Sequence, residues 1–401
     1  RANLQITLPG FSPGKFELDL LRPQMDFSVG DLRVSVVIRR AGETGNGGSR
    51  GGDDRNHAIV KVYYATDRAR ISYEPLDYGG DRSPTGRLQL GRFDVSVPRD
   101  HQLAKVERPT ILTFWREDPN KHFIIVRRIA QTYDQYYREI ASLVGQSQRK
   151  EVFVFVHGFN VTFESAIYRT AQMAYDLGFD GAPIVYSWPS EGSMVRYPVD
   201  LNNNDWTWPN LRWFLEDIAA KTGAQKVHLI AHSMGNRALV NALNRIVTEQ
   251  RSTPRPRFSQ VVLTAPDIDA AQFIQLAQSL RSGAERVTLY ASSNDEALKL
   301  SKAYQGYQRA GDSSPDVVVV PGLDTIDVSA IDTNLIGHFY YGDNRSVLTD
   351  IFYLLRDARP PGERFGLRQV TQGPRCQRSR NNPHARSSKI PHLLRSRQEE
   401  P

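Results

Sequence analysis

Ser233 lies in the segment AHSMG, residues 231–235, where its surroundings fit a catalytic nucleophile. The apolar run VHLIA predicts a strand that ends just before the serine, and a helical pattern begins directly after it. A serine held in a strained turn between a strand and a helix projects its hydroxyl above the sheet. Such a turn needs small residues two positions before and after the serine, and Ala231 and Gly235 meet this need. The alternative is a serine that only caps the helix.

A serine hydroxyl is a poor nucleophile at neutral pH and needs a base, which a third group orients. In a sheet of this kind the partners follow in the order serine, acid, histidine. The chain has nine histidines, and His338 in NLIGHFYYGDN is the one that follows the last predicted strand and precedes the last predicted helix. We therefore expect His338 to be the base, and an ordinary loop histidine is the alternative.

Two loops offer the acid. Asp295, in LYASSNDEAL, follows a predicted strand and is the preferred partner of the histidine. Asp267, in TAPDIDAAQF one strand earlier, is the alternative acid. Asp267 and Asp269 also fit the simpler role of capping the predicted helix at 270–281, so both interpretations stay open.

Negative charge that develops on a carbonyl oxygen during acyl transfer is stabilised by backbone N–H groups. One donor is expected at Met234, directly after the serine, and a second at Phe159 or Asn160. The last two lie in the segment HGFN, which follows the first core strand and in which Gly158 permits a close approach of the backbone. Losing one such donor costs about 2.7–4 kcal/mol in comparable enzymes. The alternative is a plain strand-to-helix turn.

Apolar runs alternate with helical patterns through the second half of the chain. This alternation predicts βαβ units, and hence an α/β fold whose mostly parallel central sheet is covered by helices on both faces. Functional residues of such sheets gather at the carboxyl ends of the strands. The expected strands are EVFVFV, PIVYSWP, KVHLIA, QVVLTAP, RVTLYAS, DVVVV and IDVSAI, and the expected helices cover 162–178, 209–222, 234–248, 270–281, 294–303 and 345–357.

The N-terminal part of the chain predicts more β-structure. KFELDL and LRVSVVIRR are typical of strands, within an N-terminal β-rich extension of residues 1–56 that ends in a Gly-rich loop. HAIVKVYYATDR, GRFDVSVPR, TILTFWRED and HFIIVRRI predict further strands, followed by a helix over 132–146. We assign residues 57–358 to the α/β domain, with the catalytic core over 150–358.

The net charge of +7 belongs to the C-terminal tail. From Arg356 onward the chain has eleven Lys and Arg against four Asp and Glu, so 40 basic and 40 acidic residues remain elsewhere. The folded body therefore predicts no specific nucleic-acid partner. Residues 359–401 lack periodicity, and we expect them to be disordered, either as a solvated terminus or as a basic arm for an anionic surface.

Several classes of protein are excluded by composition. Cys376 is the single cysteine, which rules out an intrachain disulfide and a cysteine-rich zinc site. The sequence has no metal-binding pattern and no phosphate-binding loop, so we expect neither a metal nor a cofactor. No apolar run approaches the roughly 20 residues of a transmembrane helix. The start at Arg1 without a signal sequence indicates a soluble protein, either cytoplasmic or exported with its signal already removed.

These motifs resemble the α/β-hydrolase superfamily, and more narrowly a bacterial family of α/β hydrolases of unknown function. The resemblance rests on VYYATDR, GRFDVSVPRDH, FVFVHGFNVTF, VYSWPS, AHSMGNRAL, LTAPDID and SNDEALKLS, with GH at 337–338. Ala231 departs mildly from the glycine that is usual at that position. The resemblance implies an eight-stranded fold and hydrolase chemistry in a bacterial protein, above all on esters.

Four of the five tryptophans fall within residues 188–213. This stretch could form a cap in which Trp188, Tyr197 and Trp206 line the substrate pocket, or the aromatic rings could simply pack against the following helix.

The sequence as a whole predicts a serine hydrolase. It would be a carboxylesterase that acts on a small-molecule ester through a Ser-His-Asp triad and an acyl-enzyme intermediate. The alternatives are an acyltransferase that uses the same triad and a catalytically silent α/β-hydrolase fold that serves as a binding module.

Overall fold

The computed structural model of the protein describes residues 56–109, 117–249, 256–330, 345–364 and 366–370, together with the backbone of five further strands. The chain divides into two compact units, Arg1–Asp53 and Asp54–Pro401. This division falls close to residue 56, where the sequence predicts the end of the N-terminal extension.

The first unit contains two antiparallel strand pairs, in agreement with the predicted β-rich extension. KFELDL and LRVSVVIRR correspond to β2 and β4, whereas most of TILTFWRED, which belongs to the second unit, lies outside the described residues. The pairs are β1 (Ala2–Ile6) with β2 (Gly14–Leu18), and β3 (Gln24–Val29) with β4 (Leu32–Val37).

The second unit is built on one large sheet, to which eleven strands contribute within the described part of the chain. These strands are β5 (His57–Thr66), β8 (Gln89–Pro98), β9 (Ile124–Gln131), β10 (Glu151–Val156), β11 (Gly181–Ser187), β12 (Lys226–His232), β13 (Phe258–Thr264), β14 (Ala284–Ala291), β15 (Asp324–Asp327), β16 (Leu367–Val370) and β17 (Leu393–Ser396). Their order is β16-β17-β15-β14-β13-β12-β10-β11-β5-β8-β9. A separate hairpin pairs β6 (Arg68–Tyr73) with β7 (Leu76–Arg82).

Most neighbouring strands of the large sheet run parallel. The pairs from β5–β11 across to β15–β17 are all parallel, whereas β5–β8, β8–β9 and β16–β17 are antiparallel. The helices are α1 (Tyr133–Gln146), α2 (Phe163–Asp176), α3 (Tyr197–Lys221), α4 (Gly235–Thr248), α5 (Ala270–Gly283), α6 (Glu296–Gln305) and α8 (Arg345–Asp357), with short turns at η2 (Met194–Arg196) and η3 (Pro361–Glu363). The predicted α/β fold with a mostly parallel sheet is confirmed.

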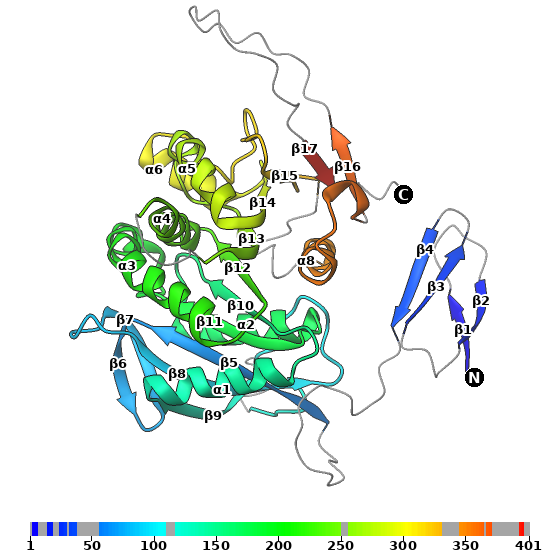
Figure 1. Cartoon of the computed structure of the whole chain (residues 1–401), viewed down its shortest axis with the longest axis horizontal. Coiled ribbons are helices and arrows are strands. Elements are labelled where there is room, and N and C mark those ends of the chain that lie inside the picture. Colours follow the sequence, from blue (N-terminus) through cyan, green and yellow to red (C-terminus); the bar gives the residue numbers. More distant parts are fainter. Residues whose placement is uncertain are drawn as a thin grey trace, which may run out of the picture. The chain divides into compact units, whose positions relative to one another are not determined.

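The central strand β10 is apolar at every position after Glu151, and its packing shows why. Val152 and Val154 pack in the core on one face of the sheet with residues of α1, α3, α4 and α5, and Phe153 and Phe155 pack on the other with residues of α2 and α8. In Figure 1, α3, α4 and α5 lie together on one side of β12–β14, and α8 lies on the opposite side. Because both faces are buried here, positions 152–155 favour apolar side chains.

Helix α3 is longer than the sequence predicts. The pattern predicts a helix over 209–222, whereas α3 is one helix of 25 residues with Pro209 in its interior. Proline removes a helical hydrogen bond, so the local signal favours a helix that starts at this residue. Buried contacts override that signal, because the Thr207 hydroxyl donates to Asp67 at 2.6 Å and fixes the preceding turn against the sheet.

The run DVVVV at 316–320 is not a strand, and this prediction is wrong. Val318 and Val320 are buried in the core beneath the sheet, so the run is apolar because of its burial and not because it pairs. The Val318 carbonyl accepts a hydrogen bond from the Thr325 hydroxyl at 3.0 Å, where a strand would have a backbone N–H as the donor. A short apolar run cannot distinguish these two arrangements.

The C-terminal tail differs in part from the predicted disorder of residues 359–401. Strand β17 pairs in parallel with β15, and β16 pairs in antiparallel orientation with β17, so both extend the edge of the large sheet. The prediction of disorder is based on the high charge and the lack of periodicity in the tail. Neither property reveals that two four-residue segments can pair with the open edge of the sheet. The remainder of the tail lies largely outside the described residues.

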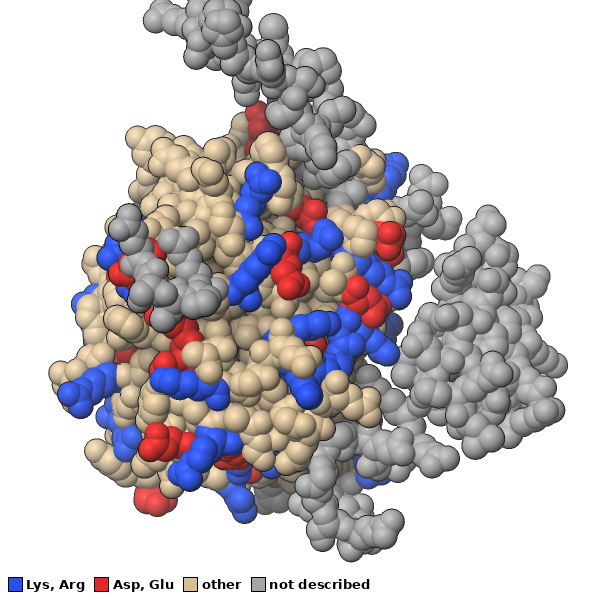
Figure 2. Space-filling view, viewed as in Figure 1, with Lys and Arg blue, Asp and Glu red and all other residues tan. Residues whose placement is uncertain are grey.

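Charges of both signs are distributed over the second unit. On the face shown in Figure 2, Lys and Arg side chains are interspersed with Asp and Glu. This mixture agrees with the equal number of basic and acidic residues before Arg356. Among the helices that the structure describes, none combines the length and the apolar character that crossing a membrane requires.

Candidate active site

Ser233 occupies a strained turn between the end of β12 and the start of α4. Its φ of 52° lies in the left-handed region, which is unfavourable for a residue with a side chain, and it is 1% exposed. Within the described residues, four hydrogen bonds hold this backbone: its N–H donates to the Thr264 carbonyl at 2.9 Å, and its carbonyl accepts from the Asn236 N–H at 3.1 Å, from Asn236 Nδ2 at 3.0 Å and from the Asp267 N–H at 3.2 Å. The N-cap of α4 is Met234 and has no side-chain cap, so the serine is not the helix cap.

Glycines allow a second loop to approach this turn. A Cβ at Gly235 would lie 2.3 Å from the carbonyl oxygen of His157, and a Cβ at Gly158 would lie 2.8 Å from the Cβ of Ser233. Both distances are shorter than any normal contact, so the loop after β10 lies directly against the serine only because neither position has a side chain. Ala231, the departure from the usual glycine, is fully buried within β12.

The backbone donors predicted from the sequence lie in these two segments. The N–H groups of Met234 and Phe159 have no hydrogen-bond acceptor within the described residues. Asn160, with a φ of 57°, directs its N–H toward Asp200 Oδ2 at 3.4 Å. Of the two predicted donors in the loop after β10, Phe159 is therefore the one whose N–H has no acceptor within the described residues.

Asp295 follows β14, at the carboxyl end of the same sheet, and is 1% exposed. Its Oδ1 accepts from the Leu298 N–H at 3.0 Å, so it is the N-cap of α6, and this cap uses one of the two carboxylate oxygens. His338, the predicted base, lies outside the described residues.

Asp267, the alternative acid, has three side-chain partners. Its Oδ2 accepts from the Tyr197 hydroxyl at 2.7 Å, and its Oδ1 accepts from the Ser301 hydroxyl at 2.5 Å. The same Oδ1 lies 3.2 Å from Nε of Arg309, whose side chain is 1% exposed. Both carboxylate oxygens are thus engaged inside the protein. Asp269, in contrast, is the N-cap of α5 and accepts from the Gln272 N–H at 2.9 Å, as one of the two sequence interpretations predicts.

Residues 133–356 match the model of a protein family described as "alpha/beta hydrolase of unknown function". The chain belongs to this family of α/β hydrolases. No curated protein matches the chain. The match extends over both the serine turn and the loop after β10, and it ends before the basic tail. It begins after β5, so the segment VYYATDR lies outside it.

In this α/β hydrolase, His157 supports the loop that contacts Ser233. Its Nδ1–H donates to the Gly158 carbonyl at 2.9 Å, which leaves Nε2 as an acceptor beside the Ser187 hydroxyl at 3.1 Å. The Trp188 indole stacks on the imidazole at 5.2 Å and donates its N–H to the His157 carbonyl at 2.7 Å. Burial, with a smaller contribution from the Arg68 charge, holds the pKa of His157 well below its usual value. The imidazole is therefore neutral and structural.

Arg68, the last residue of VYYATDR, connects this loop to two strand ends. It is 1% exposed, and burial lowers its pKa to about 10, so the guanidinium stays charged at neutral pH. It makes no ion pair within the described residues and instead donates to neutral acceptors. These are Val161 O at 2.7 Å, Gly79 O and Ser190 O at 2.8 Å, Ser187 Oγ at 2.9 Å and His157 Nε2 at 3.3 Å.

Replacing Arg68 with methionine is expected to lower the free energy of unfolding by about 3–5 kcal/mol, because it leaves several buried acceptors without a donor. Urea denaturation measures the effect. Arg70→Met is the matched control, since Arg70 lies on the same strand but donates a single hydrogen bond, of 3.4 Å, to Tyr78 within the described residues. A loss of less than about 1 kcal/mol in both variants would contradict the structural role of Arg68.

The aromatic residues predicted to line a pocket occupy three different environments. Trp188 is fully buried beneath the loop after β10, where it packs against His157. Tyr197 is half-buried, and its ring meets the edge of Phe159 at 5.1 Å, beside the serine turn. Trp206 packs under the Arg82 guanidinium at 5.1 Å, at the end of β7. Tyr197 is therefore the one of the three that contacts a predicted backbone donor.

The described residues contain no group of three or more His, Cys, Asp and Glu side chains that could hold a metal ion.

Proposed function

We propose that the protein is a serine hydrolase that cleaves carboxylic esters. Ser233 Oγ attacks the carbonyl carbon while His338 takes the hydroxyl proton, and the tetrahedral oxyanion is stabilised by the N–H groups of Met234 and Phe159. The C–O bond to the alcohol then breaks, and His338 returns the proton to the leaving alcohol. Water attacks the acyl-serine in the same way and releases the acid. Asp295 orients the imidazole throughout.

One observation carries this proposal: the strained turn of Ser233 lies directly against Gly158 in the loop after β10. A non-glycine residue in the left-handed region costs about 1–2 kcal/mol, and such strain persists where the surrounding structure enforces it. The turn and the adjoining loop also contain the two N–H groups that lack an acceptor within the described residues. Open N–H groups occur at the start of any helix, but an ordinary strand-to-helix connection does not need the strain at the serine.

The assignment of the partners follows from the neighbouring side chains. His157 is unsuited as the base because both of its ring nitrogens are engaged with the protein, which favours His338. Asp267 already accepts from two hydroxyl groups and faces the buried cation of Arg309, which favours Asp295 as the acid. Asp295 lies at the end of β14, two strands beyond β12, as the order serine, acid, histidine requires.

A fluorophosphonate probe, which reacts only with an activated serine, tests the proposal. Wild-type protein is expected to be labelled, and Ser233→Ala is expected to show no labelling. A protein that is folded by circular dichroism but does not react with the probe would defeat the enzyme proposal and favour a binding module. An acyltransferase would also be labelled, but it would transfer the acyl group to an added alcohol in preference to water.

A further inference from the structure

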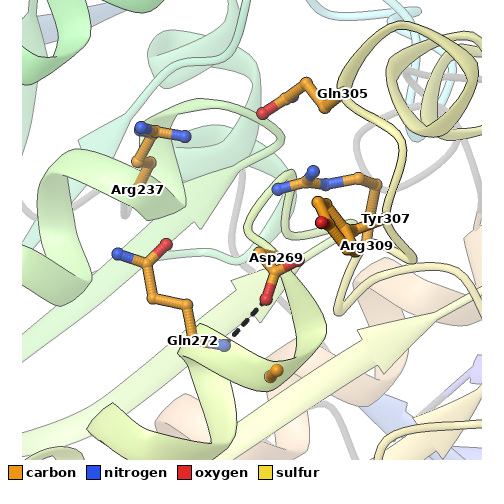
Figure 3. A pocket seen from close by; sticks show the side chains of 7 residues that line it. Arg237, Asp269, Gln272, Gln305, Tyr307 and Arg309 are labelled. Carbon is orange, nitrogen blue, oxygen red and sulfur yellow. Dashed lines mark hydrogen bonds between the residues drawn. The ribbon is translucent and has the colours of Figure 1, made fainter.

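A pocket of about 440 Å³ is lined by Arg237, which follows Ser233 by four residues. It lies between the first turn of α4, the first turn of α5 and the segment that follows α6 (Figure 3). Six of its seven lining residues have a polar or charged side chain: Arg237, Asp269, Gln272, Gln305, Tyr307 and Arg309.

Arg309 contributes an unusual buried cation to this pocket. The residue is 1% exposed, and among the described residues its side chain forms an ion pair with Asp267, from Nε to Oδ1 at 3.2 Å. Its Nη2 is buried and has no hydrogen-bond partner within the described part of the chain, and its Nε faces Asp267 without hydrogen-bond geometry. A guanidinium has five N–H donors, and leaving them unsatisfied away from water is unfavourable. An anion in the pocket would satisfy donors that the protein leaves open.

Arg237 lies on the opposite side of the pocket. The guanidinium groups of Arg237 and Arg309 point toward each other in Figure 3. Arg237 is held from behind by Asp205, through contacts of 2.8 Å from Nε and 3.3 Å from Nη2. The Asp205 side chain is 52% exposed, so water screens its charge and it neutralises Arg237 only in part. Two cations facing each other across a cavity favour an anion between them.

The acidic residues nearby do not fill this role. Asp269 lines the pocket, but its Oδ1 accepts from the Gln272 N–H at 2.9 Å to cap α5. Asp267 lies behind Arg309, and its two oxygens also accept from Tyr197 and Ser301. The first turn of α5 adds the partial positive charge of a helix N-terminus.

We propose that this pocket binds a carboxylate or phosphate group carried by the substrate of Ser233, an inference that rests on the proposed function. Asp267 connects the serine turn to the pocket. Its N–H donates to the Ser233 carbonyl at 3.2 Å, and its carboxylate faces Arg309. The substrate class is thus an ester whose acyl or alcohol part ends in an anionic group. Arg309 and Arg237 would fix that end and direct the carbonyl to the serine.

Direct binding tests the pocket independently of catalysis. Inorganic phosphate and succinate are titrated by calorimetry into the full-length wild-type chain, Arg237→Gln and Arg245→Gln. The control Arg245→Gln removes the same charge from the same helix, where Arg245 pairs with Glu249 at 3.3 Å away from the pocket. We expect the wild type and the control to bind at least one anion, and Arg237→Gln to weaken its Kd at least tenfold. Arg309→Met is less informative, because it leaves Asp267 buried without its cation.

Hydrolysis of charged and neutral esters shows whether the pocket prefers a carboxylate or a phosphate group. The neutral substrate is 4-nitrophenyl acetate, and the charged ones are the mono-4-nitrophenyl ester of succinate and the 4-nitrophenyl ester of phosphonoacetate. The ratio of kcat/KM, charged over neutral, is expected to exceed ten for one charged ester in the wild type and to fall at least tenfold in Arg237→Gln. Equal ratios in both proteins, or an anion Kd that Arg237→Gln leaves unchanged, would overturn the inference. If no ester is cleaved, the proposed function fails, and the titrations alone decide the pocket.

Discussion

Ser233→Ala is expected to lower kcat for ester hydrolysis by about a million-fold, to the level set by the remaining binding groups. The reason is that no other group in the proposed mechanism can form the acyl-enzyme, so the base and the backbone donors are left without a nucleophile to activate or an oxyanion to stabilise. The measurement is single-turnover release of 4-nitrophenol, with protein purified under conditions that exclude wild-type contamination.

The backbone strain at Ser233 allows a second test, a comparison of the free energies of unfolding of two variants. A serine in an unstrained surface turn would show no such difference. Ser233→Gly removes the same hydroxyl as Ser233→Ala but tolerates a φ of 52°. Relief of about 1–2 kcal/mol of strain, offset by about 0.4–1 kcal/mol of extra entropy in the unfolded chain, predicts from the midpoints of both ranges that the glycine variant is about 0.8 kcal/mol more stable than the alanine variant. Urea denaturation of the two inactive variants measures this difference.

The outcome that opposes this account is specific. Residual activity of Ser233→Ala within about tenfold of the wild type would mean that another residue supplies the nucleophile. Equal stability of the alanine and glycine variants would mean that the turn relaxes when the hydroxyl is removed, so that the strain belongs to the serine side chain and not to the packing of Gly158 and Gly235 around it.

The sequence predicts well those parts of the structure that are determined by neighbouring residues in the chain. The run VFVFV at 152–156 is apolar at every position because both faces of β10 are buried, and this pattern, next to a helical segment, predicts a covered parallel strand. Gly235 and the strand before Ser233 predict the turn because bulk at residue 235 would meet the backbone of the neighbouring loop. The order of strands then places the loops after β10, β12 and β14 at one edge of the sheet.

The parts that sequence patterns miss depend on contacts between distant segments. Pro209 signals a helix boundary, yet the buried contact between Thr207 and Asp67 joins residues 140 positions apart and keeps α3 intact. From the sequence, Arg68 is an ordinary charged residue at the end of a predicted strand, and its neighbours in the chain do not indicate that it is buried. One signal was available: β5 is parallel to β11, so the rule that function gathers at carboxyl ends of strands applies to Arg68 as well. Arg309 has no comparable local signal.

The second large effect is expected at Asp295, the acid that we prefer over Asp267 for the triad. Asp295→Asn is expected to lower kcat by about ten thousand-fold, because an amide can neither hold the required imidazole tautomer nor stabilise the imidazolium that forms. Stability should change by less than about 1 kcal/mol, since asparagine caps a helix as well as aspartate does and the contact to the Leu298 N–H can persist.

Asp267→Asn is expected to show the reverse pattern. It removes the negative charge that faces Arg309, and breaking a buried ion pair from one side costs about 3–5 kcal/mol. At a temperature where the variant remains folded, its kcat on the neutral ester should fall far less than that of Asp295→Asn, because its oxygens serve Tyr197 and Ser301 and not the base. Measuring both variants by denaturation and by turnover assigns each carboxylate separately. A loss of several orders of magnitude in Asp267→Asn alone would move the acid of the triad one strand earlier, to the end of β13, and the buried cation of Arg309 would then act on the catalytic carboxylate itself.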